Sequence, residues 1–397
     1  LNRSLYPRTL EYYEKAVSIC VNCDGHDPII DRTLMETLIG TSFVHRLQGE
    51  YEEAFDCLER AGELIFSGGE EVPADIRALY YTRKADVISE LGSKDEAIEL
   101  YGRALETYRS IDDLPGQGTV LNNMHGIFSS RGDYARSLGT LEEVVRINTN
   151  LDDKLGLAIA YFNIAEYYQE INMLDMAREY YDKYMEINDL IKNELGVGYG
   201  SYGLAKLYWL EGDLEKSRYF FENAIEVFEK LSVDRMRTSC ELMRAQILIY
   251  MDEFNSAREI LDSIDDDTKN PEVELSTRFM KGLVRLHDPK AGDEDYQAAA
   301  DMFIDVLDSR PDHSGVELAI YHSALVAALE KLGRKKAMIA TLREGSEKLA
   351  EKLARIDSYS IRNSIMTRRE IAEFIALCRD RGLPFPPEGF SFHTASE

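Results

Sequence analysis

The pair Cys20-x-x-Cys23, with His26 three residues later, is the sharpest cluster of side chains that could bind a metal ion or carry out redox chemistry. A structural zinc site needs four such ligands, and no second Cys or His pair lies nearby in the sequence. A thioredoxin-like redox motif needs a βαβ setting, which the surrounding sequence does not offer. We therefore interpret both cysteines as small apolar residues near a helix end, and we expect no structural metal and no cofactor.

The glycine-rich run from Gly196 to Gly200, which reads Gly-Val-Gly-Tyr-Gly, resembles a loop that cradles phosphate. Such a loop must follow a strand and open a helix. No strand pattern precedes this run, so we do not expect nucleotide binding. The glycines are better explained as positions at which two helices pack closely.

No further pattern points to catalysis. The sequence contains no P-loop, HExxH or G-x-S-x-G motif, and its seven histidines do not pair at the spacing of metal ligands. Paired carboxylates are abundant, but in so acidic a chain they are usually a solvated face. We expect a protein that is not an enzyme.

The charge balance excludes further classes of function. The 397 residues include 46 basic and 72 acidic side chains, for a formal net charge of −26. Binding to nucleic acid or to an anionic membrane needs a basic surface, so neither partner is expected. No run of 18 apolar residues would span a membrane, and five mostly scattered cysteines fit a reducing, cytoplasmic location.

One short pattern recurs along the chain at a nearly constant interval. It consists of Gly, Asn or Asp, followed five positions later by a small residue, and its copies start 43, 40, 40, 40 and 40 residues apart. The copies run Gly49–Ala54, Gly92–Ala97, Gly132–Ser137, Asn172–Ala177, Gly212–Ser217 and Asp252–Ala257, with weaker ones at Glu294–Ala299 and near Gly333.

Each part of the pattern has a physical reason. Gly, Asn and Asp tolerate the left-handed backbone that ends a helix, and the small residue lets the next helix approach closely. A large apolar residue follows four positions later, and apolar residues before each turn recur at helical spacing. The large residues are Leu58, Tyr101, Leu141, Tyr181, Phe221, Leu261 and Phe303. Each repeat is therefore a helix, a tight turn and a second helix.

The Gly-Asp-Tyr turn at Gly132–Tyr134 and the Ala-x-x-Tyr-Tyr run at Ala177–Tyr181 resemble the tetratricopeptide repeat family. The resemblance covers roughly Arg32 to Ile356. The 40-residue period exceeds the usual 34 and is similar to that of the long-helix subgroup in kinesin light chain, LGN-type adaptors and bacterial regulators. It implies an all-α fold, a right-handed α-α superhelix of about eight helix-turn-helix repeats with end caps.

The sequence predicts three regions. Residues 1–31 are a partial N-terminal repeat or cap, residues 32–356 are the repeat solenoid, and residues 357–397 are a C-terminal cap with an irregular tail. An insertion is expected around Asp288–Gly292 in the seventh repeat. In the C-terminal region, Asn363–Arg381 reads as one amphipathic helix, and the tail from Pro384 is expected to be irregular.

The resemblance implies that the first helix of each repeat lines a concave face, where a ligand would bind. Stepping by the repeat period gives stripes of residues on these helices. Asparagine is a poor helix former, but an amide can both donate and accept hydrogen bonds, and Asn123 and Asn163 match the asparagine that peptide-binding members commonly use. The predicted peptide-binding residues are Arg83, Asn122, Asn123, Asn163, Glu166, Tyr202, Lys206, Trp209 and Gln246.

The expected function is therefore a scaffold that binds a protein or peptide in this groove. The partner could also be another domain of the same parent chain. The alternative is the C-terminal sensor region of a larger signal-transduction ATPase, kinase or transcription regulator, which a first residue other than methionine, Leu1, supports. A third reading, a peptide-pheromone receptor with phosphatase activity, would need an additional N-terminal helical bundle.

Overall fold

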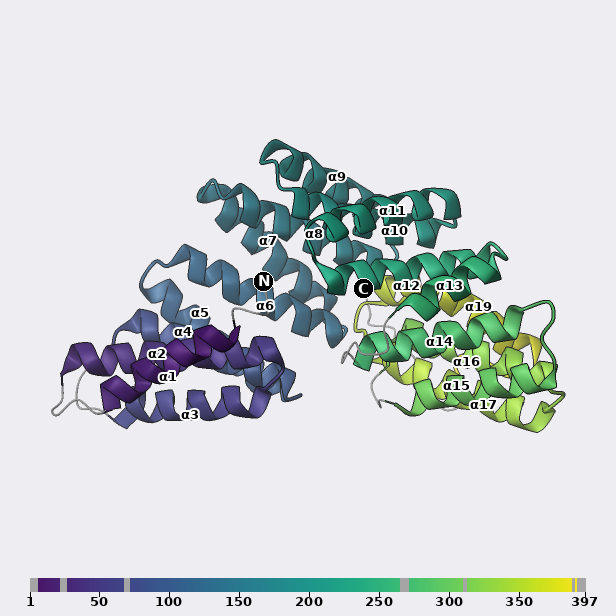
Figure 1. Ribbon diagram of the computed structural model, residues 1–397, viewed down its shortest axis with the longest axis horizontal. Coiled ribbons are helices and arrows are strands. Elements are labelled where there is room, and N and C mark those ends of the chain that lie inside the picture. Colours follow the sequence, from purple (N-terminus) through teal and green to yellow (C-terminus); the bar gives the residue numbers. More distant parts are fainter. Residues whose placement is uncertain are drawn as a thin grey trace. The chain divides into compact units, whose positions relative to one another are not determined.

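The protein is built from α-helices packed side by side, as the computed structural model shows (Figure 1). The structure describes residues 6–21, 27–67, 72–264, 271–309, 313–387 and 390, and within these it contains nineteen helices and no strand. Cys23 and His26 lie outside the described residues, as does most of the tail from Pro384. The all-α class that the repeat pattern predicts is confirmed.

The helices fall into two compact units, which we describe separately. The first unit comprises Leu1–Ser130 and Ala135–Asp153. Its helices are α1 (Tyr6–Val21), α2 (Pro28–Gln48), α3 (Tyr51–Ser67), α4 (Ala74–Glu90), α5 (Lys94–Ser110), α6 (Leu114–Ser130) and α7 (Tyr134–Asn150).

The second unit comprises Arg131–Tyr134 and Lys154–Glu397. Its repeat helices are α8 (Lys154–Glu170), α9 (Leu174–Leu190), α10 (Glu194–Glu211), α11 (Leu214–Lys230), α12 (Asp234–Tyr250), α13 (Phe254–Ser263), α14 (Pro271–His287), α15 (Asp293–Asp308), α16 (Gly315–Lys331) and α17 (Lys335–Ala354). Two shorter helices, α18 (Tyr359–Met366) and α19 (Arg369–Asp380), follow. The predicted insertion forms the connection between α14 and α15.

Residues with a left-handed backbone mark the turns that the pattern predicts. Within repeats they have φ between 60° and 95° and are Gly49, Gly92, Gly132, Asn172, Gly212, Asp252 and Gly333. A second set, with φ between 50° and 55°, lies between repeats at Asp112, Asp152, Lys192 and Ser232. Backbone amides after these helix ends bond back to the last turn, as from Gly49 N to Arg46 O at 3.1 Å. This arrangement satisfies carbonyls that the helix itself leaves free.

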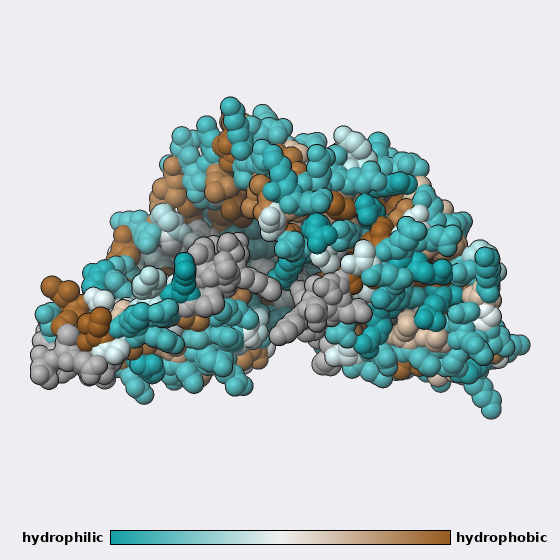
Figure 2. Space-filling view, viewed as in Figure 1, coloured by the Kyte–Doolittle hydropathy of each residue, from teal (hydrophilic) through white to brown (hydrophobic). Residues whose placement is uncertain are grey.

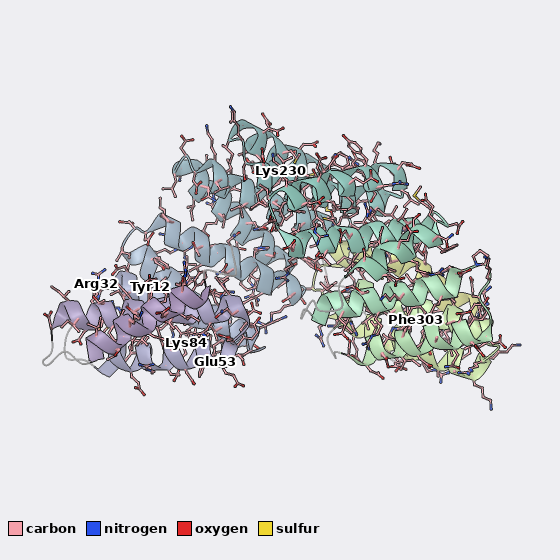
Figure 3. All side chains as sticks on the ribbon, in the orientation of Figure 1. Tyr12, Arg32, Glu53, Lys84, Lys230 and Phe303 are labelled. Atoms are coloured by element: carbon pink, nitrogen blue, oxygen red, sulfur yellow. The ribbon has the colours of Figure 1, made fainter. Side chains whose placement is uncertain are left out.

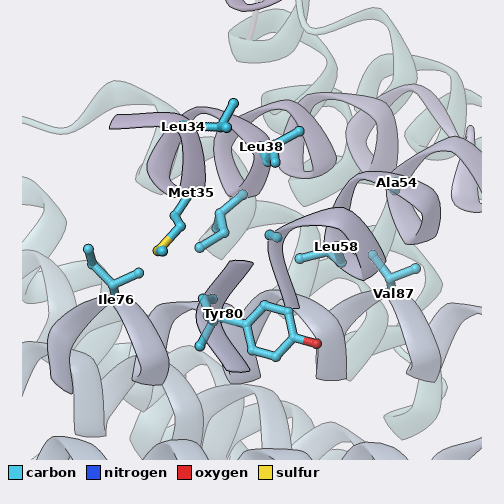
Figure 4. Packing of buried hydrophobic residues seen from close by; sticks show 11 residues of the cluster. Leu34, Met35, Leu38, Ala54, Leu58, Ile76, Tyr80 and Val87 are labelled. Carbon is cyan, nitrogen blue, oxygen red and sulfur yellow. The ribbon is translucent and has the colours of Figure 1, made fainter. Parts of the chain in front are cut away.

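The small and large residues of the pattern form the core between helices. Ala54, Ala97 and Ala177 are fully buried, and so are their serine counterparts Ser137 and Ser217. All seven large residues named above are buried too. In the first unit, Leu34, Leu38, Leu58, Ile76, Tyr80 and Val87 pack together in one cluster from α2, α3 and α4 (Figure 4). Burial of this apolar surface is the main force that holds neighbouring repeats together.

The glycine-rich start of α10 is a close-packing surface. A Cβ atom added at Gly196 would lie 1.8 Å from Asn188 Oδ1, and one at Gly200 would lie 2.2 Å from Met185 Sδ. Both neighbours belong to α9, so only glycine lets these two helices approach so closely. These contacts support the interpretation of the glycines as positions at which two helices pack closely.

The first helices of successive repeats approach one another, whereas successive second helices do not approach as closely among the described residues. In the first unit α2 contacts α4 and α4 contacts α6, and in the second unit α8 contacts α10 and α12 contacts α14. The first helices therefore lie on the side of each stack where the repeats converge. We call this side of each unit its first-helix face.

The C-terminal region differs from its prediction. One helix was expected over Asn363–Arg381, but α18 ends at Met366 and α19 begins at Arg369. The Thr367 hydroxyl donates to Ser364 O at 2.6 Å, and such local side-chain bonds compete with helix continuation. The backbone amide of Arg368 bonds to Ile365 O at 3.0 Å, which closes the last turn of α18. The break separates Arg368 from the helix that precedes it.

The surface carries the acid excess. The face drawn in Figure 2 is mostly hydrophilic, with smaller apolar patches. Exposed basic residues such as Arg32 and Lys230 form ion pairs with acids on neighbouring helices (Figure 3). No helix in the described part of the chain is long and apolar enough to cross a membrane.

Candidate functional site

In the first unit, a hydrogen-bond network centred on Asp86 lies on the first-helix face. Asp86 belongs to α4 and is only 7% exposed. Its carboxylate accepts bonds from the Tyr101 hydroxyl at 2.6 Å and from Asn123 Nδ2 at 2.9 Å, and it pairs with Arg83 Nη1 at 3.2 Å. Three helices thus contribute to one buried network, which satisfies an otherwise costly buried charge.

The network holds its side chains in defined positions. Burial, followed by the negative charge of Asp86, raises the pKa of Tyr101 above its usual value, so this hydroxyl remains a donor. The guanidinium of Arg83 also lies 4.3 Å from the centre of the Phe43 ring on α2. The predicted residues Arg83 and Asn123 are therefore brought together.

Asn122 is the neighbour of Asn123 on α6 and is half-buried. Arg46 approaches the same Phe43 ring, with its guanidinium 5.5 Å from the ring centre. Its Nη1 atom lies 3.8 Å from Glu90 Oε1. The first-helix face of this unit therefore combines one aromatic ring with amides, cations and a carboxylate, which are groups that can contact a peptide backbone and its side chains.

In the second unit, Glu166 on α8 and Lys206 on α10 form the corresponding pair. Lys206 Nζ lies 3.3 Å from Glu166 Oε1 and 5.2 Å from the centre of the Tyr202 ring. Burial acts to lower the pKa of Lys206, but Tyr202 and Glu166 outweigh it, and the pKa is raised above its ordinary value. Lys206 is therefore held as a cation, half-buried on the first-helix face, and Asn163 lies half-buried on α8.

Trp209 and Gln246 lie deeper than the sequence suggests. They are 6% and 7% exposed. Trp209 meets Tyr250 of α12 edge to face, with ring centres 4.8 Å apart and an interplanar angle of 89°. The guanidinium of Arg369, at the start of α19, lies 4.9 Å from the centre of the Trp209 ring and 5.7 Å from that of Tyr250. A side chain from the C-terminal region thus covers the tryptophan.

Further contacts join the same region to the repeats of the second unit. We call residues 355–370, which connect α17 to α19, the return segment. A Cβ atom added at Gly132, in a turn within a repeat, would lie 3.3 Å from Ile356 Cγ1. At the equivalent turn of the next repeat, Asn172 Nδ2 donates to Thr367 Oγ1 at 3.1 Å. The return segment therefore passes two successive turns within repeats.

Sequence reasoning did not select Asp86, Tyr250 or Arg369 as site residues. Asp86 could have been found, because it occupies the same repeat position as Glu166 and Lys206. Arg369 has no such signal, since it contacts Trp209 from 160 positions away along the chain. Only the packing of α19 brings it there.

Other clusters and pockets among the described residues are weaker candidates for a functional site. No group of three or more His, Cys, Asp or Glu residues there could hold a metal ion. A pocket of about 340 Å³ lies between α11, α12 and α13. It is lined by Arg218, whose guanidinium pairs with Glu222 at 3.1 Å and Glu253 at 3.5 Å. These three side chains pair with one another, whereas Nε of Arg244, in the same lining, has no hydrogen-bond partner among the described residues.

Comparison with known proteins agrees with this architecture. Residues 116–189 match the family profile described as tetratricopeptide repeat. The 43 kDa receptor-associated protein of the synapse from Tetronarce californica is 25% identical over 193 residues, which make up 49% of this chain and 46% of that protein. The chain thus spans about half the length of the curated relative that it matches.

Solved structures resemble the fold over most of the chain. A Rap protein in complex with competence and sporulation factor is 14% identical, with a TM-score of 0.58 over 88% of this chain and 99% of that one. Aspartyl phosphate phosphatase F from Bacillus subtilis is 13% identical, with the same TM-score over 88% and 94%. The quorum sensor NprR from B. thuringiensis is 16% identical, with a TM-score of 0.53 over 86% and 83%. At these identities the likeness shows the fold alone.

Paired helices, turns at a regular interval and a polar first-helix face define a helical repeat scaffold. Residues 116–189 match the tetratricopeptide-repeat family, and the fold of the chain resembles that of solved helical repeat proteins.

Proposed function

We propose that this chain is a scaffold that binds a protein or peptide on the first-helix face of its repeats, and that it does not catalyse a reaction. The observation that carries the proposal is the Asp86 network. It holds Arg83 and Asn123, two side chains that can reach a ligand, at positions that helix packing does not require to be polar.

The physical argument rests on preorganisation. A side chain that is already fixed by hydrogen bonds loses little further freedom when a ligand arrives, so less binding energy is lost to ordering. Asn123 donates one of its two amide hydrogens to Asp86, and this bond fixes the direction of the side-chain carbonyl oxygen of Asn123. In the second unit, the pair Glu166 and Lys206 offers an acceptor and a donor of opposite charge.

Proteins of similar fold include NprR, which was solved in complex with its cognate peptide NprX. That likeness motivates a peptide as the first ligand to test. It says nothing about which peptide, because the sequence identity is only 16%.

The test begins with a ligand selected from a random peptide library on the full chain. Asn123→Ala and Asn163→Ala are then made separately, so that each unit is examined by itself. The loss of a hydrogen bond to a buried backbone group costs about 1–3 kcal/mol, so the variant in the unit that binds should weaken binding about tenfold or more.

The matched control changes Glu179 and Lys183 to alanine. These residues pair with each other at 2.7 Å on the second helix α9. The control should leave the affinity unchanged. If it abolishes binding while both asparagine variants bind normally, the ligand lies on the second helices and the proposed site is wrong.

A sensor region of a larger signalling protein is the second candidate. The return segment favours it, because a segment that contacts several repeats can report on a ligand that binds them. In that case a ligand selected on the full chain should change amide hydrogen exchange in α18 and α19. Unchanged exchange with a saturating ligand would argue for a simple scaffold.

A further inference from the structure

The contact between Arg369 and the rings of Trp209 and Tyr250 shows what this part of the first-helix face accepts. The two rings meet nearly at right angles, and the guanidinium lies within 6 Å of both ring centres. A guanidinium at this distance is attracted by the negative face of an aromatic ring. The rings therefore form a binding site for a cation.

Arg369 is an imperfect occupant of this site. Nη2 of Arg369 is buried and has no hydrogen-bond partner among the described residues. A buried donor without an acceptor is unfavourable, because it has lost its bonds to water and gained none. An arginine that brought its own acceptor, such as a neighbouring backbone carbonyl or carboxylate, would fit the same rings better.

Arg369 lies beside the break between two anchored helices. The α19 helix is anchored elsewhere, since Phe374 and Cys378 are fully buried and the helix packs on α16 and α17. At the other end, Arg362 Nη2 bonds to Ile356 O and holds α18. Between them lies the break, where Thr367 still has a helical backbone and Arg368 leaves it, with φ −59° and ψ 131°.

The electrostatic field of the chain favours a basic ligand. The formal net charge of the chain is −26, and such an excess attracts cationic segments and repels acidic ones over distances of about a Debye length. Around the rings, the positive charge of Arg369 is opposed by the negative charges of Glu373 and Glu370, of which Glu370 also pairs with Arg368 at 3.4 Å. An acidic ligand would have to approach against both.

We propose that the Trp209 and Tyr250 rings are an arginine-binding site, occupied by Arg369 of the return segment, and that the natural partner presents an arginine-bearing peptide segment that displaces it. This inference rests on the proposed binding function and names the chemistry of the partner. The return segment acts as an internal competitor. Only molecules in which Arg369 has left the rings can bind the partner, so the apparent affinity falls in proportion to that fraction.

The test uses the full chain and the fluorescence of Trp209, which is the sole tryptophan in the sequence. The probe is a synthetic peptide with the sequence of residues 363–375, which contains both arginines of the break. Arg369→Ala should make Trp209 more accessible to acrylamide quenching. It should also bind the probe at least tenfold more tightly than the unaltered chain does.

Four comparisons separate arginine recognition from other effects. A probe with both arginines changed to alanine should lose at least tenfold in affinity, and a lysine probe should bind more weakly than the arginine probe, because it lacks the planar guanidinium. A glutamate probe should not bind. Arg343→Ala, at an exposed position of α17, controls for the loss of one positive charge and should bind the probe like the unaltered chain.

A second variant tests displacement with the C-terminal region intact. Asn172→Cys combined with Thr367→Cys places two thiols at a hydrogen-bonded pair of positions, so oxidation should tie the return segment down. The oxidised variant should bind neither the probe nor any arginine-bearing ligand, and reduction should restore binding. Each single-cysteine variant should respond to neither treatment.

Several outcomes would overturn the inference. These are equal binding of the probe to the unaltered and Arg369→Ala chains, no binding to either, tight binding of the glutamate probe, or binding that survives the oxidised lock. A library ligand that depends on Asn163 but is indifferent to Arg369→Ala and to the lock would sink this inference and leave the binding function standing. If the probe binds as expected but no library ligand is found, the arginine-binding site stands and the proposed binding function is contradicted.

Discussion

The side-chain amide of Asn123 lies 2.9 Å from the carboxylate of Asp86, so that α6 and α4 are joined across the first-helix face by a polar bond as well as by their core. The asparagine predicted to grip a ligand is thus also part of a structural network. Its removal therefore tests two roles at once, stability and binding.

Replacing Asp86 by alanine should destabilise the first unit. The buried Tyr101 hydroxyl and the Asn123 amide would lose their acceptor, and Arg83 would lose its ion pair. Breaking a buried charged network from one side typically costs about 3–5 kcal/mol. Chemical unfolding followed by circular dichroism should show an earlier loss of helix. Glu96→Ala, at an exposed position of α5, should change the free energy of unfolding by less than about 0.5 kcal/mol.

Two glycine-to-alanine changes should have opposite effects. Alanine in a helix is favoured over glycine by about 1 kcal/mol, and at Gly102 an added Cβ meets nothing within 4 Å. At Gly203 the Cβ would lie 2.3 Å from Tyr181 Cε1, and Tyr181 is fully buried. We expect Gly102→Ala to raise the thermal midpoint and Gly203→Ala to lower it. A rise in both would show that α9 and α10 can shift apart freely.

Mild acid should loosen the C-terminal helices through His322. This residue is 1% exposed, its ring lies 6.2 Å from that of Phe374 on α19, and burial lowers its pKa below the ordinary 6.5. Below pH 6.5 the unfolded chain binds a proton that the folded chain refuses, so the free energy of unfolding falls as the pH falls. Nearby Glu344 opposes this shift, whereas Lys348 and His313 reinforce it.

Hydrogen exchange of the α19 amides between about pH 8 and about pH 5.5, corrected for the intrinsic rate, measures this effect. His322→Leu should remove most of the pH dependence. His287, whose pKa burial also lowers, would account for a remainder in α14. Equal slopes in the variant and the unaltered chain would exclude His322 as the cause.

The cysteines should differ in their reactivity toward an alkylating reagent at neutral pH. Burial raises the pKa of Cys240 to about 12 and that of Cys378 to about 11, and the reactive species is the thiolate. Cys20 and Cys57 are only half-buried, and burial raises the pKa of the Cys57 thiol as well. Among these four cysteines, mass spectrometry after brief treatment should find Cys20 modified first, and denaturation should equalise them. Early modification of Cys240 would mean that α12 opens readily.

Repeat spacing alone determined the local architecture. A residue that must adopt a left-handed backbone, a small residue and a large apolar one recur together because each solves a local problem of turn, approach and packing. Gly132, Ser137 and Leu141 therefore occupy the turn and core positions that their spacing predicts. The same regularity placed Arg83, Asn123 and Lys206 on first helices.

Tertiary packing decided what the repeat pattern cannot encode. The pattern repeats, whereas the break at Thr367 and the contact of Arg369 with Trp209 occur once, between segments far apart in the chain. Sequence position assigned Trp209 to a ligand-facing stripe, but its burial depends on a helix that folds back from the C-terminal region. Periodicity reports on neighbours within and between repeats. A contact made across many repeats leaves no periodic trace, because nothing in the local spacing depends on it.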